Sequence, residues 1–441
     1  MLSRKNSAVF LSVVLAAGMV GYYLHIFLPR VRTTRAARQI TFFYGEDLYP
    51  YWSGTRELFT ERVSPYSEQV TREIQVAIYG RPLNPQNPFE RDQHRFSYPL
   101  YVVFLMAPVA WFPFSTVRGG TAIALPLLAL LGIVLWKRAF RLDLSLQQLA
   151  IVGMLTLSSY SLLNAQFAQQ LGLIVFLFLS ACVWCLSKQR FRLAGILLAL
   201  STIKPQLVVL IVLFLLLWAV SEWQAQKTFL KSFFGTLGVM LVASIWLLPT
   251  WPRDWLHTIT AYRQYTVPPL AQLFMGKVTG TIVTGALIFL SAWLSWKARH
   301  SEISSPAFAL ALSFTLATSV VTLPSADSVY DHILIMPGLL LLISRWREIA
   351  SGNRITRVLL LISIAVFAWQ WIAGTVVFLA DLVWPGLIQS PYILSAPLRT
   401  QPSMPFALLA LLGLSVFHFS DLSKPPGSMD RPQPSSSNFA S

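Results

Sequence analysis

The sequence predicts an all-α polytopic membrane protein, and three observations support this prediction. First, 55% of the 441 residues are hydrophobic and only 12% are charged, about half the charged fraction of a soluble protein. Second, long uncharged apolar runs recur from Val9 to Phe419, more than the interior of a water-soluble fold can bury. Third, short basic clusters separate these runs, which is the pattern that orients membrane helices.

The first predicted helix covers residues 8–28 and follows Arg4 and Lys5, which place its amino end in the cytoplasm. The run is too long for the apolar region of a cleaved signal peptide, so we expect it to remain in the protein. Residues 29–97 form a hydrophilic segment that contains ten arginines and eight of the 18 acidic residues. Because long segments cross a membrane largely regardless of their charge, we predict a first external loop here.

From residue 137 onward, basic clusters alternate with uncharged or mixed segments, so the chain is expected to cross the membrane between them. The clusters predicted to be cytoplasmic are Lys137, Arg138 and Arg141; Lys188, Arg190 and Arg192; Lys227 and Lys231; Lys297 and Arg299; and Arg345, Arg347, Arg354 and Arg357. The predicted external return points are residues 164–170, 204–206, 250–280, 324–332 and 381–400.

The count of crossings depends on residues 98–114 and 121–136, which look like two spans where the alternation allows one. Pro99, Pro108 and Pro113 interrupt the first run, which favours a re-entrant or interfacial helix. We therefore expect about 12 transmembrane helices, or about 13 if both runs cross. A single membrane domain is expected over residues 1–419, and the Pro/Ser-rich residues 420–441 are predicted to be a disordered cytoplasmic tail.

The charge balance and the cysteines indicate what the protein does not bind. The net charge of +16 would suggest nucleic acid in a soluble protein, but orientation in the bilayer explains basic clusters placed between apolar runs. Cys182 and Cys185 lie inside an apolar run without a thioredoxin-like pattern, so we predict packing residues. The six histidines are scattered, and the sequence therefore predicts neither a metal nor another cofactor.

Ionisable residues gather in the predicted external segments rather than inside the apolar runs, where a transporter usually carries them. This distribution favours an enzyme at the membrane surface that acts on a bilayer-anchored substrate. A carrier for neutral lipids is the alternative. Aromatic residues accompany the external charges and suit either an interfacial belt or stacking on sugars.

Several stretches resemble glycosyltransferase family 87. Residues 47–59, which read Asp-Leu-Tyr-Pro-Tyr-Trp-Ser-Gly-Thr-Arg-Glu-Leu-Phe, resemble the start of its first external loop, as do Ser64-Pro65-Tyr66 and Phe96-Ser97-Tyr98-Pro99. The later elements are similar to its Gly-Gln-x-Asn, Ala-Gly, Leu-Lys-Pro and Tyr-Asp pattern: Ala165-Gln166-Phe167-Ala168, Ala194-Gly195, Ile203-Lys204-Pro205 and Tyr330-Asp331. The first of these departs from the family at its first and last positions, where Ala165 and Ala168 replace glycine and asparagine, which puts the polar role of that turn in question.

The resemblance implies a GT-C fold and an inverting transfer of a sugar, mannose foremost, from a polyprenyl-phosphate donor to a lipid or glycan acceptor. The reaction is expected at the outer face of a bacterial-type plasma membrane, with the bilayer, the donor and the acceptor as partners and without nucleic acid. The resemblance assigns Asp47 as the general base. Because phosphate is a leaving group that needs no protonation, a single carboxylate suffices for this chemistry.

The other site predictions follow from the chemistry of the substrates. The donor phosphate needs cationic partners, for which we predict Lys204, at a proline-broken helix end, and Arg263. Asp331 and His332 are predicted to orient the acceptor or to support the base. Candidate acceptor- or sugar-binding residues are Tyr49, Trp52, Tyr66, Gln166 and His257.

Each assignment has a structural alternative. Asp47 could instead be a solvated charge or the N-cap of a helix over residues 48–59. The side chains of Lys204 and Arg263 could instead extend to the membrane interface. His332 could instead be an interfacial histidine whose hydrogen bonds are satisfied. At the level of function, the alternatives are a polyprenyl-linked glycan carrier or flippase without catalytic activity and a membrane scaffold. The chain shows no internal half-symmetry of the kind that many transporters have.

Overall fold

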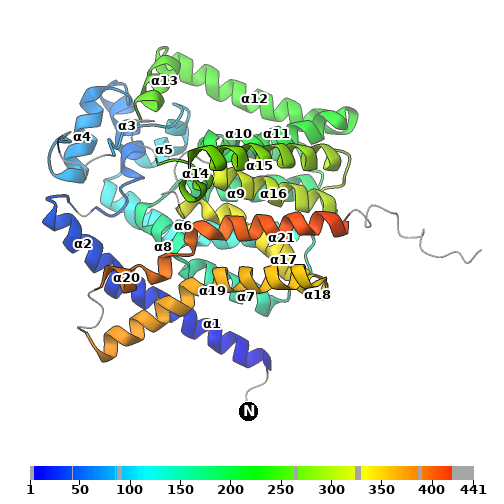
Figure 1. Ribbon diagram of the computed structural model, residues 1–441. Coiled ribbons are helices and arrows are strands. Elements are labelled where there is room, and N and C mark those ends of the chain that lie inside the picture. The colour runs from blue at the N-terminus through cyan, green and yellow to red at the C-terminus, as the bar shows by residue number, and fades with distance from the viewer. Residues whose placement is uncertain are drawn as a thin grey trace, which may run out of the picture.

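The computed structural model describes residues 4–41, 43–84, 86, 92–262, 267–322, 329–385 and 390–419. Over these residues the chain forms helices and turns without a strand, which confirms the predicted all-α class (Figure 1). The carboxyl-terminal residues 420–441, predicted to be a disordered tail, lie outside the described residues.

The chain begins with a nearly continuous helical rod. It consists of α1 (Arg4–Gly21), a π-helical turn (Tyr22–Phe27) and α2 (Leu28–Ala37). The predicted first helix ended at residue 28, but the helical rod continues past Pro29, which follows the π-helical turn directly and lies in the first turn of α2. Three of the ten arginines expected in the loop, Arg30, Arg32 and Arg35, therefore lie in this helix instead.

The predicted external loop is itself largely helical. It contains α3 (Tyr49–Thr60) and α4 (Glu68–Tyr79). Ser67 caps the start of α4 by accepting a hydrogen bond from the N–H of Val70. Val70, Ile74 and Ile78 recur every four residues and bury one face of this helix completely. The hydrophilic segment is thus a small packed cap on the membrane helices.

Residues 98–114 do not form a full crossing. The helix within them, α5 (Val102–Ala110), has nine residues and is therefore about 14 Å long, against about 30 Å of bilayer hydrocarbon. The next helix, α6 (Phe114–Ala139), is long enough to span. This agrees with the expectation that only one of the two apolar runs crosses the membrane.

The remaining helices continue the bundle to residue 419. In order they are α7 (Leu146–Ser158), α8 (Tyr160–Ala168), α9 (Gly172–Ser187), α10 (Phe191–Ser201), α11 (Pro205–Ser221), α12 (Trp223–Leu247), α13 (Trp251–Tyr262), α14 (Leu270–Met275), α15 (Lys277–Ala298), α16 (Pro306–Thr322), the 3-10 helix η2 (Val329–Ile335), α17 (Met336–Ser344), α18 (Trp346–Ala350), α19 (Arg354–Val383), α20 (Pro391–Leu394), two 3-10 turns (Ala396–Leu398 and Gln401–Ser403) and α21 (Met404–Phe419).

Five helices in the described part of the chain are long and apolar enough to cross a membrane: Asn6–Ala37, α6, α12, α15 and α19. The pair α7 and α8, bent by 55°, adds a sixth if it counts as one span. Five further apolar segments have only 10–17 residues, fewer than the about 20 that a crossing needs. The polytopic class is confirmed, but full-length spans are fewer than the about 12 or 13 expected, because turns divide several apolar runs.

The outer surface of the bundle suits lipid. Only 22% of the most apolar window is buried in each of α12 and α15. Large apolar side chains such as Val239, Trp246 and Phe289 are exposed on these two helices. Such a surface is stable in contact with hydrocarbon and would aggregate in water.

The segments predicted to return on the external side meet at one end of the bundle. Lys204 donates hydrogen bonds to Gln170 (3.3 Å) and Asp331 (2.8 Å), and the Trp255 indole donates to the carbonyl of Ser97 (3.0 Å). The cap helices α3 and α4 lie at this end, and α21 ends at the other (Figure 1). The convergence agrees with the predicted alternation, and the compartment that each end faces stays a prediction.

Candidate functional site

Asp47 lies in a tight turn directly before α3. Gly45 adopts a left-handed conformation (φ +83°) in this turn, which a residue with a side chain rarely adopts. The backbone N–H groups of Gly45 and Asp47 donate to the carbonyls of Phe167 (2.9 Å) and Ala168 (3.1 Å) at the end of α8. Leu48, not Asp47, is the N-cap residue of α3, and no side chain caps this helix. The capping alternative for Asp47 is therefore excluded.

The end of α8, which holds the Asp47 turn in place, also bears on the departure from the family pattern at residues 165–168. Its contribution to the site is made by two backbone carbonyls, at Phe167 and Ala168. Any residue type at these two positions provides the same acceptors. The apolar side chains there consequently do not remove the contact that holds Asp47.

A continuous line of polar contacts joins Asp47 to Asp331. The Nε2 of Gln170 donates a hydrogen bond to Oδ2 of Asp47. Lys204 Nζ donates to Oε1 of the same Gln170 (3.3 Å) and to both carboxylate oxygens of Asp331 (2.8 and 2.9 Å). We call these four residues the polar chain. Three of them were predicted from the sequence as site residues, and the fold brings all three together.

The cation of the polar chain is buried. The side chains of Lys204 and Asp331 are 6% and 2% exposed, so Lys204 points into the protein instead of reaching for the interface. Pro205 begins α11 immediately after it and disfavours helical geometry at Lys204. A Cβ on Gly172 would lie 2.6 Å from Oδ1 of Asp331, so a side chain at this position would displace the Asp331 carboxylate from its present place beside Lys204.

The environment of Asp47 favours its protonated form. Burial, and then the nearby charge of Glu46, raise the pKa of the Asp47 carboxyl to about 7, while His94 and Lys204 oppose the shift. Glu46 itself pairs with Arg35 of α2 through two contacts of 2.8 and 3.1 Å. A carboxyl with a pKa near 7 is well matched to general-base catalysis at neutral pH.

The predicted sugar-binding aromatic residues belong to a packed cluster around α3. Trp52 is 8% exposed, and its indole donates to the carbonyl of Phe112 (3.2 Å). Tyr66 is also 8% exposed, and its hydroxyl donates to the carbonyl of Tyr98 (2.7 Å). Tyr49 is half-buried and contacts the Trp52 ring. These contacts hold the cap together, and sugar binding by the three residues stays a prediction.

The remaining predicted binding residues differ in their accessibility. Gln166 is half-buried on α8, and its Nε2 donates to the carbonyl of Ala122 (2.5 Å). His257 is exposed on α13. Arg263, the second predicted phosphate ligand, lies outside the described residues. Neither Gln166 nor His257 is a member of the polar chain.

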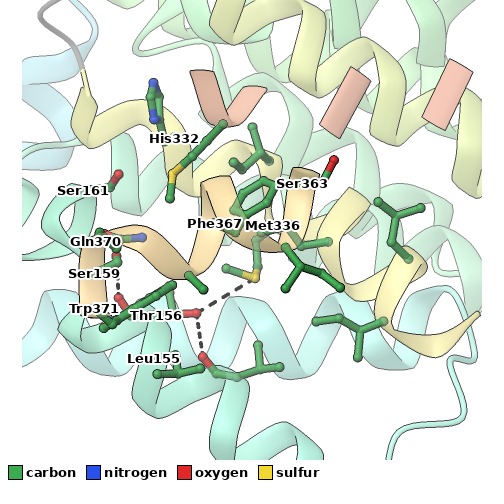
Figure 2. A pocket seen from close by; sticks show the side chains of 18 of the residues that line it. Leu155, Thr156, Ser159, Ser161, His332, Met336, Ser363, Phe367, Gln370 and Trp371 are labelled. Atoms are coloured by element: carbon green, nitrogen blue, oxygen red, sulfur yellow. Dashed lines mark hydrogen bonds between the residues drawn. The ribbon is translucent and has the colours of Figure 1, made fainter. Parts of the chain in front are cut away.

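His332 follows Asp331 directly in η2 but faces a different environment. Successive residues of a 3-10 helix point about 120° apart. Asp331 contacts Lys204, whereas His332 lines a large apolar cavity, at whose edge it lies in Figure 2. Its Nδ1 is buried and has no hydrogen-bond partner among the described residues. Both the predicted role of His332 and its structural alternative stay predictions.

Sequence reasoning missed the residues that connect the predicted ones. Gln170 lies in a turn that was expected on the external side, but nothing in its spacing indicated a contact with Asp47. Beside the site, Asp92 accepts hydrogen bonds from the hydroxyl of Tyr262 (2.8 Å) and the backbone N–H of His94 (2.9 Å). His94 has a left-handed backbone (φ +46°), which is uncommon outside glycine and occurs often at functional sites.

Among the described residues, no group of three or more His, Cys, Asp or Glu side chains is placed to hold a metal ion. Cys182 and Cys185 are free, buried thiols in α9, in agreement with their predicted packing role. The expectation that the enzyme needs no metal stays a prediction.

Comparison with known proteins adds one finding. No curated protein matches the chain. The model of glycosyltransferase family 87 matches residues 96–324, just over half of the chain. This match includes Gln170, Gly172 and Lys204, while Asp47 lies before it and Asp331 after it. With its helical membrane architecture and a matched segment of this length, the chain belongs to glycosyltransferase family 87.

Proposed function

We propose that this membrane glycosyltransferase transfers mannose from a polyprenyl-phosphate donor to a lipid or glycan acceptor, with inversion at the anomeric carbon. The observation that supports the proposal is the polar chain. One end of it presents a carboxyl whose pKa is about 7. Next to its other end, Asp331, the chain holds the buried Lys204, a cation suited to a phosphate.

In the proposed reaction, an acceptor hydroxyl attacks the anomeric carbon of the donor sugar. The new C–O bond forms as the bond to the phosphate oxygen breaks, and the departing phosphate keeps the electron pair. Asp47 takes the proton of the acceptor hydroxyl. Lys204, with Arg263 as the second proposed ligand, stabilises the negative charge on the leaving phosphate.

Asp331 and His332 have supporting roles in this proposal. Asp331 holds Lys204 in place through two contacts, and His332 provides an unpaired ring nitrogen on the other side of η2. Of the five proposed acceptor- or sugar-binding residues, the exposed or half-buried Tyr49, Gln166 and His257 are reachable without repacking. Trp52 and Tyr66 would act by shaping the cap.

The test is transfer by purified Asp47→Asn protein with radiolabelled polyprenyl-phosphate-mannose and candidate acceptors. The variant is nearly isosteric and can still accept the hydrogen bond from Gln170. We expect it to fold, to bind the donor and to lose about 10²–10⁴ in turnover. Glu61→Gln, which neutralises an exposed carboxylate at the end of α3, is the matched control and should remain active.

Near-normal transfer by Asp47→Asn would remove this residue from the mechanism. A carrier or flippase predicts a different result, because wild-type protein would then move intact donor across vesicles without forming a glycosylated product. Assays on one preparation of the purified protein therefore distinguish a glycosyltransferase from a carrier or flippase.

The proposed location is the outer face of a bacterial-type plasma membrane. In a background without Cys182 and Cys185, a cysteine at exposed His257 should label from outside intact cells. A cysteine at exposed Arg190 should label only after permeabilisation. Labelling of both from the same side would contradict the proposed orientation.

A further inference from the structure

The helical rod at the start of the chain extends past the bilayer at the end of the bundle where the cap lies (Figure 1). About 20 helical residues cross the hydrocarbon, so a span that starts at Ala8 leaves it near Leu28. Each further residue adds about 1.5 Å along the rod. The headgroup layer on each side is about 5–8 Å thick. The first turns of α2 therefore lie in this layer, and its last turn lies above it.

Four arginines and no acidic residue occur between Leu28 and the end of α2 at Arg38. Arg30 and Arg32 follow Leu28 by about 3 and 6 Å along the rod, which places both at the depth of the lipid phosphates. Their side chains are exposed, and neither forms an ion pair with another described residue. Arg35, one turn farther on, differs because it pairs with Glu46.

Packing does not stabilise α2. None of its residues is buried, whereas most helices in proteins are held by an apolar face. Arg32 and Arg35 are three positions apart, a spacing at which like charges repel each other on a helix surface. A short helix with this composition is marginal in water. A negative charge beside Arg30 and Arg32 would stabilise it.

The orientation of the protein in the membrane does not explain these two arginines either. Basic residues that flank a membrane helix normally lie on the cytoplasmic side. The cap end of the bundle is predicted to be external, and Arg30 and Arg32 lie at this end. Unlike the basic clusters at the opposite end, they are therefore not accounted for by topology.

We infer that Arg30 and Arg32 bind the phosphate groups of anionic phospholipids in the headgroup layer beside α2. A guanidinium group donates paired hydrogen bonds to phosphate oxygens. Phosphatidylcholine also carries a phosphate, but its own cation balances that charge. The preference is therefore for lipids with a net negative charge, by about fivefold per arginine. This binding involves neither donor nor acceptor and goes beyond the proposed function.

The test measures which lipid surrounds α2. Full-length protein without Cys182 and Cys185 carries a fluorophore on Thr33→Cys, an exposed position of α2, and is reconstituted into phosphatidylcholine vesicles. A small fraction of phosphatidylglycerol or of phosphatidylcholine carries a quenching nitroxide near the headgroup end of its acyl chain. We expect the anionic lipid to quench more strongly, and this excess to fall with added salt. Equal quenching by the two lipids would overturn the inference.

A probe position and two sets of variants localise the effect. A fluorophore on Thr60→Cys, exposed in the cap, should show no excess quenching by the anionic lipid. Arg30→Gln/Arg32→Gln should remove most of the excess at Thr33→Cys, because each arginine contributes about fivefold. Arg62→Gln/Arg72→Gln makes the same change in net charge at exposed cap residues and should preserve it.

Persistence of the excess in the α2 variant, or an equal loss in the cap variant, would contradict binding at Arg30 and Arg32. Arg30→Lys/Arg32→Lys keeps both charges and should retain most of the excess. This variant repeats the test if the glutamine variant melts at a lower temperature than wild type. Loss of the excess in a lysine variant that melts like wild type would also overturn the inference.

Discussion

The raised pKa of Asp47 predicts a specific pH dependence of sugar transfer. A general base acts in its deprotonated form, so kcat should rise with pH through about 7. With that pKa, roughly one tenth of the carboxyl is charged at pH 6 and roughly nine tenths at pH 8. We therefore expect an about tenfold rise in kcat from pH 6 to the alkaline plateau.

Two neighbouring variants should move this rise in opposite directions. Glu46→Gln removes a charge that raises the pKa of Asp47 and releases Arg35, whose cation also interacts with Asp47. Both effects lower the pKa of Asp47, so the rise shifts to lower pH. Arg35→Gln leaves Glu46 unpaired and shifts the rise in kcat to higher pH. Exposed Glu61 does not contribute to this pKa, and Glu61→Gln should leave the profile unchanged.

The assay is the initial rate of mannosyl transfer at saturating donor, measured from about pH 5.5 to about pH 8.5 with a thermal melt at each pH. The melts also test the sign of the pKa shift. Because the folded-state pKa is raised, ionisation opposes folding as pH rises through about 7. Asp47→Asn should accordingly melt no lower than wild type at pH 8. A flat rate profile between pH 6 and pH 8, or shifts of the same sign in the Glu46 and Arg35 variants, would refute the reasoning.

Three further predictions concern the buried ion pair of Lys204 and Asp331, the neighbouring Gly172, and the predicted independence of the reaction from metal ions. Lys204→Met leaves Asp331 buried and unpaired, which should lower the free energy of unfolding by about 3–5 kcal/mol. The double variant Lys204→Met/Asp331→Asn should recover much of the melting temperature but no transfer activity. Gly172→Ala places a Cβ 2.6 Å from Oδ1 of Asp331 and should reduce transfer and cost about 1–3 kcal/mol, whereas Gly119→Ala, with open space around its Cβ, should change neither rate nor melting temperature. Treatment with EDTA should leave the rate unchanged, and a complete loss restored by Mn²⁺ or Mg²⁺ would contradict a metal-independent mechanism.

Local features of the sequence were sufficient to predict the membrane class and the candidate charges. The class follows from composition alone, because hydrocarbon is the only solvent for so much apolar surface. The alternation of basic clusters predicts which turns share one end of the bundle, and the described contacts between them agree. Asp47, Lys204 and Asp331 were identifiable because each lies in such a turn and matches a short family pattern. Helix boundaries were less predictable, as Pro29 and residues 29–97 show.

Only the tertiary structure decided how these residues relate to each other. Gln170 joins Asp47 to Lys204, Arg35 neutralises Glu46, and His332 faces a cavity while its neighbour Asp331 faces the lysine. Each relation depends on which helices pack together and how each turn is rotated. The packing depends on contacts between residues far apart in the sequence, such as Gln170 and Asp47, which are 123 positions apart. A periodicity or a short motif reflects only residues that are close in the sequence. The pKa of Asp47 and the position of the cavity therefore could be determined only from the packed fold.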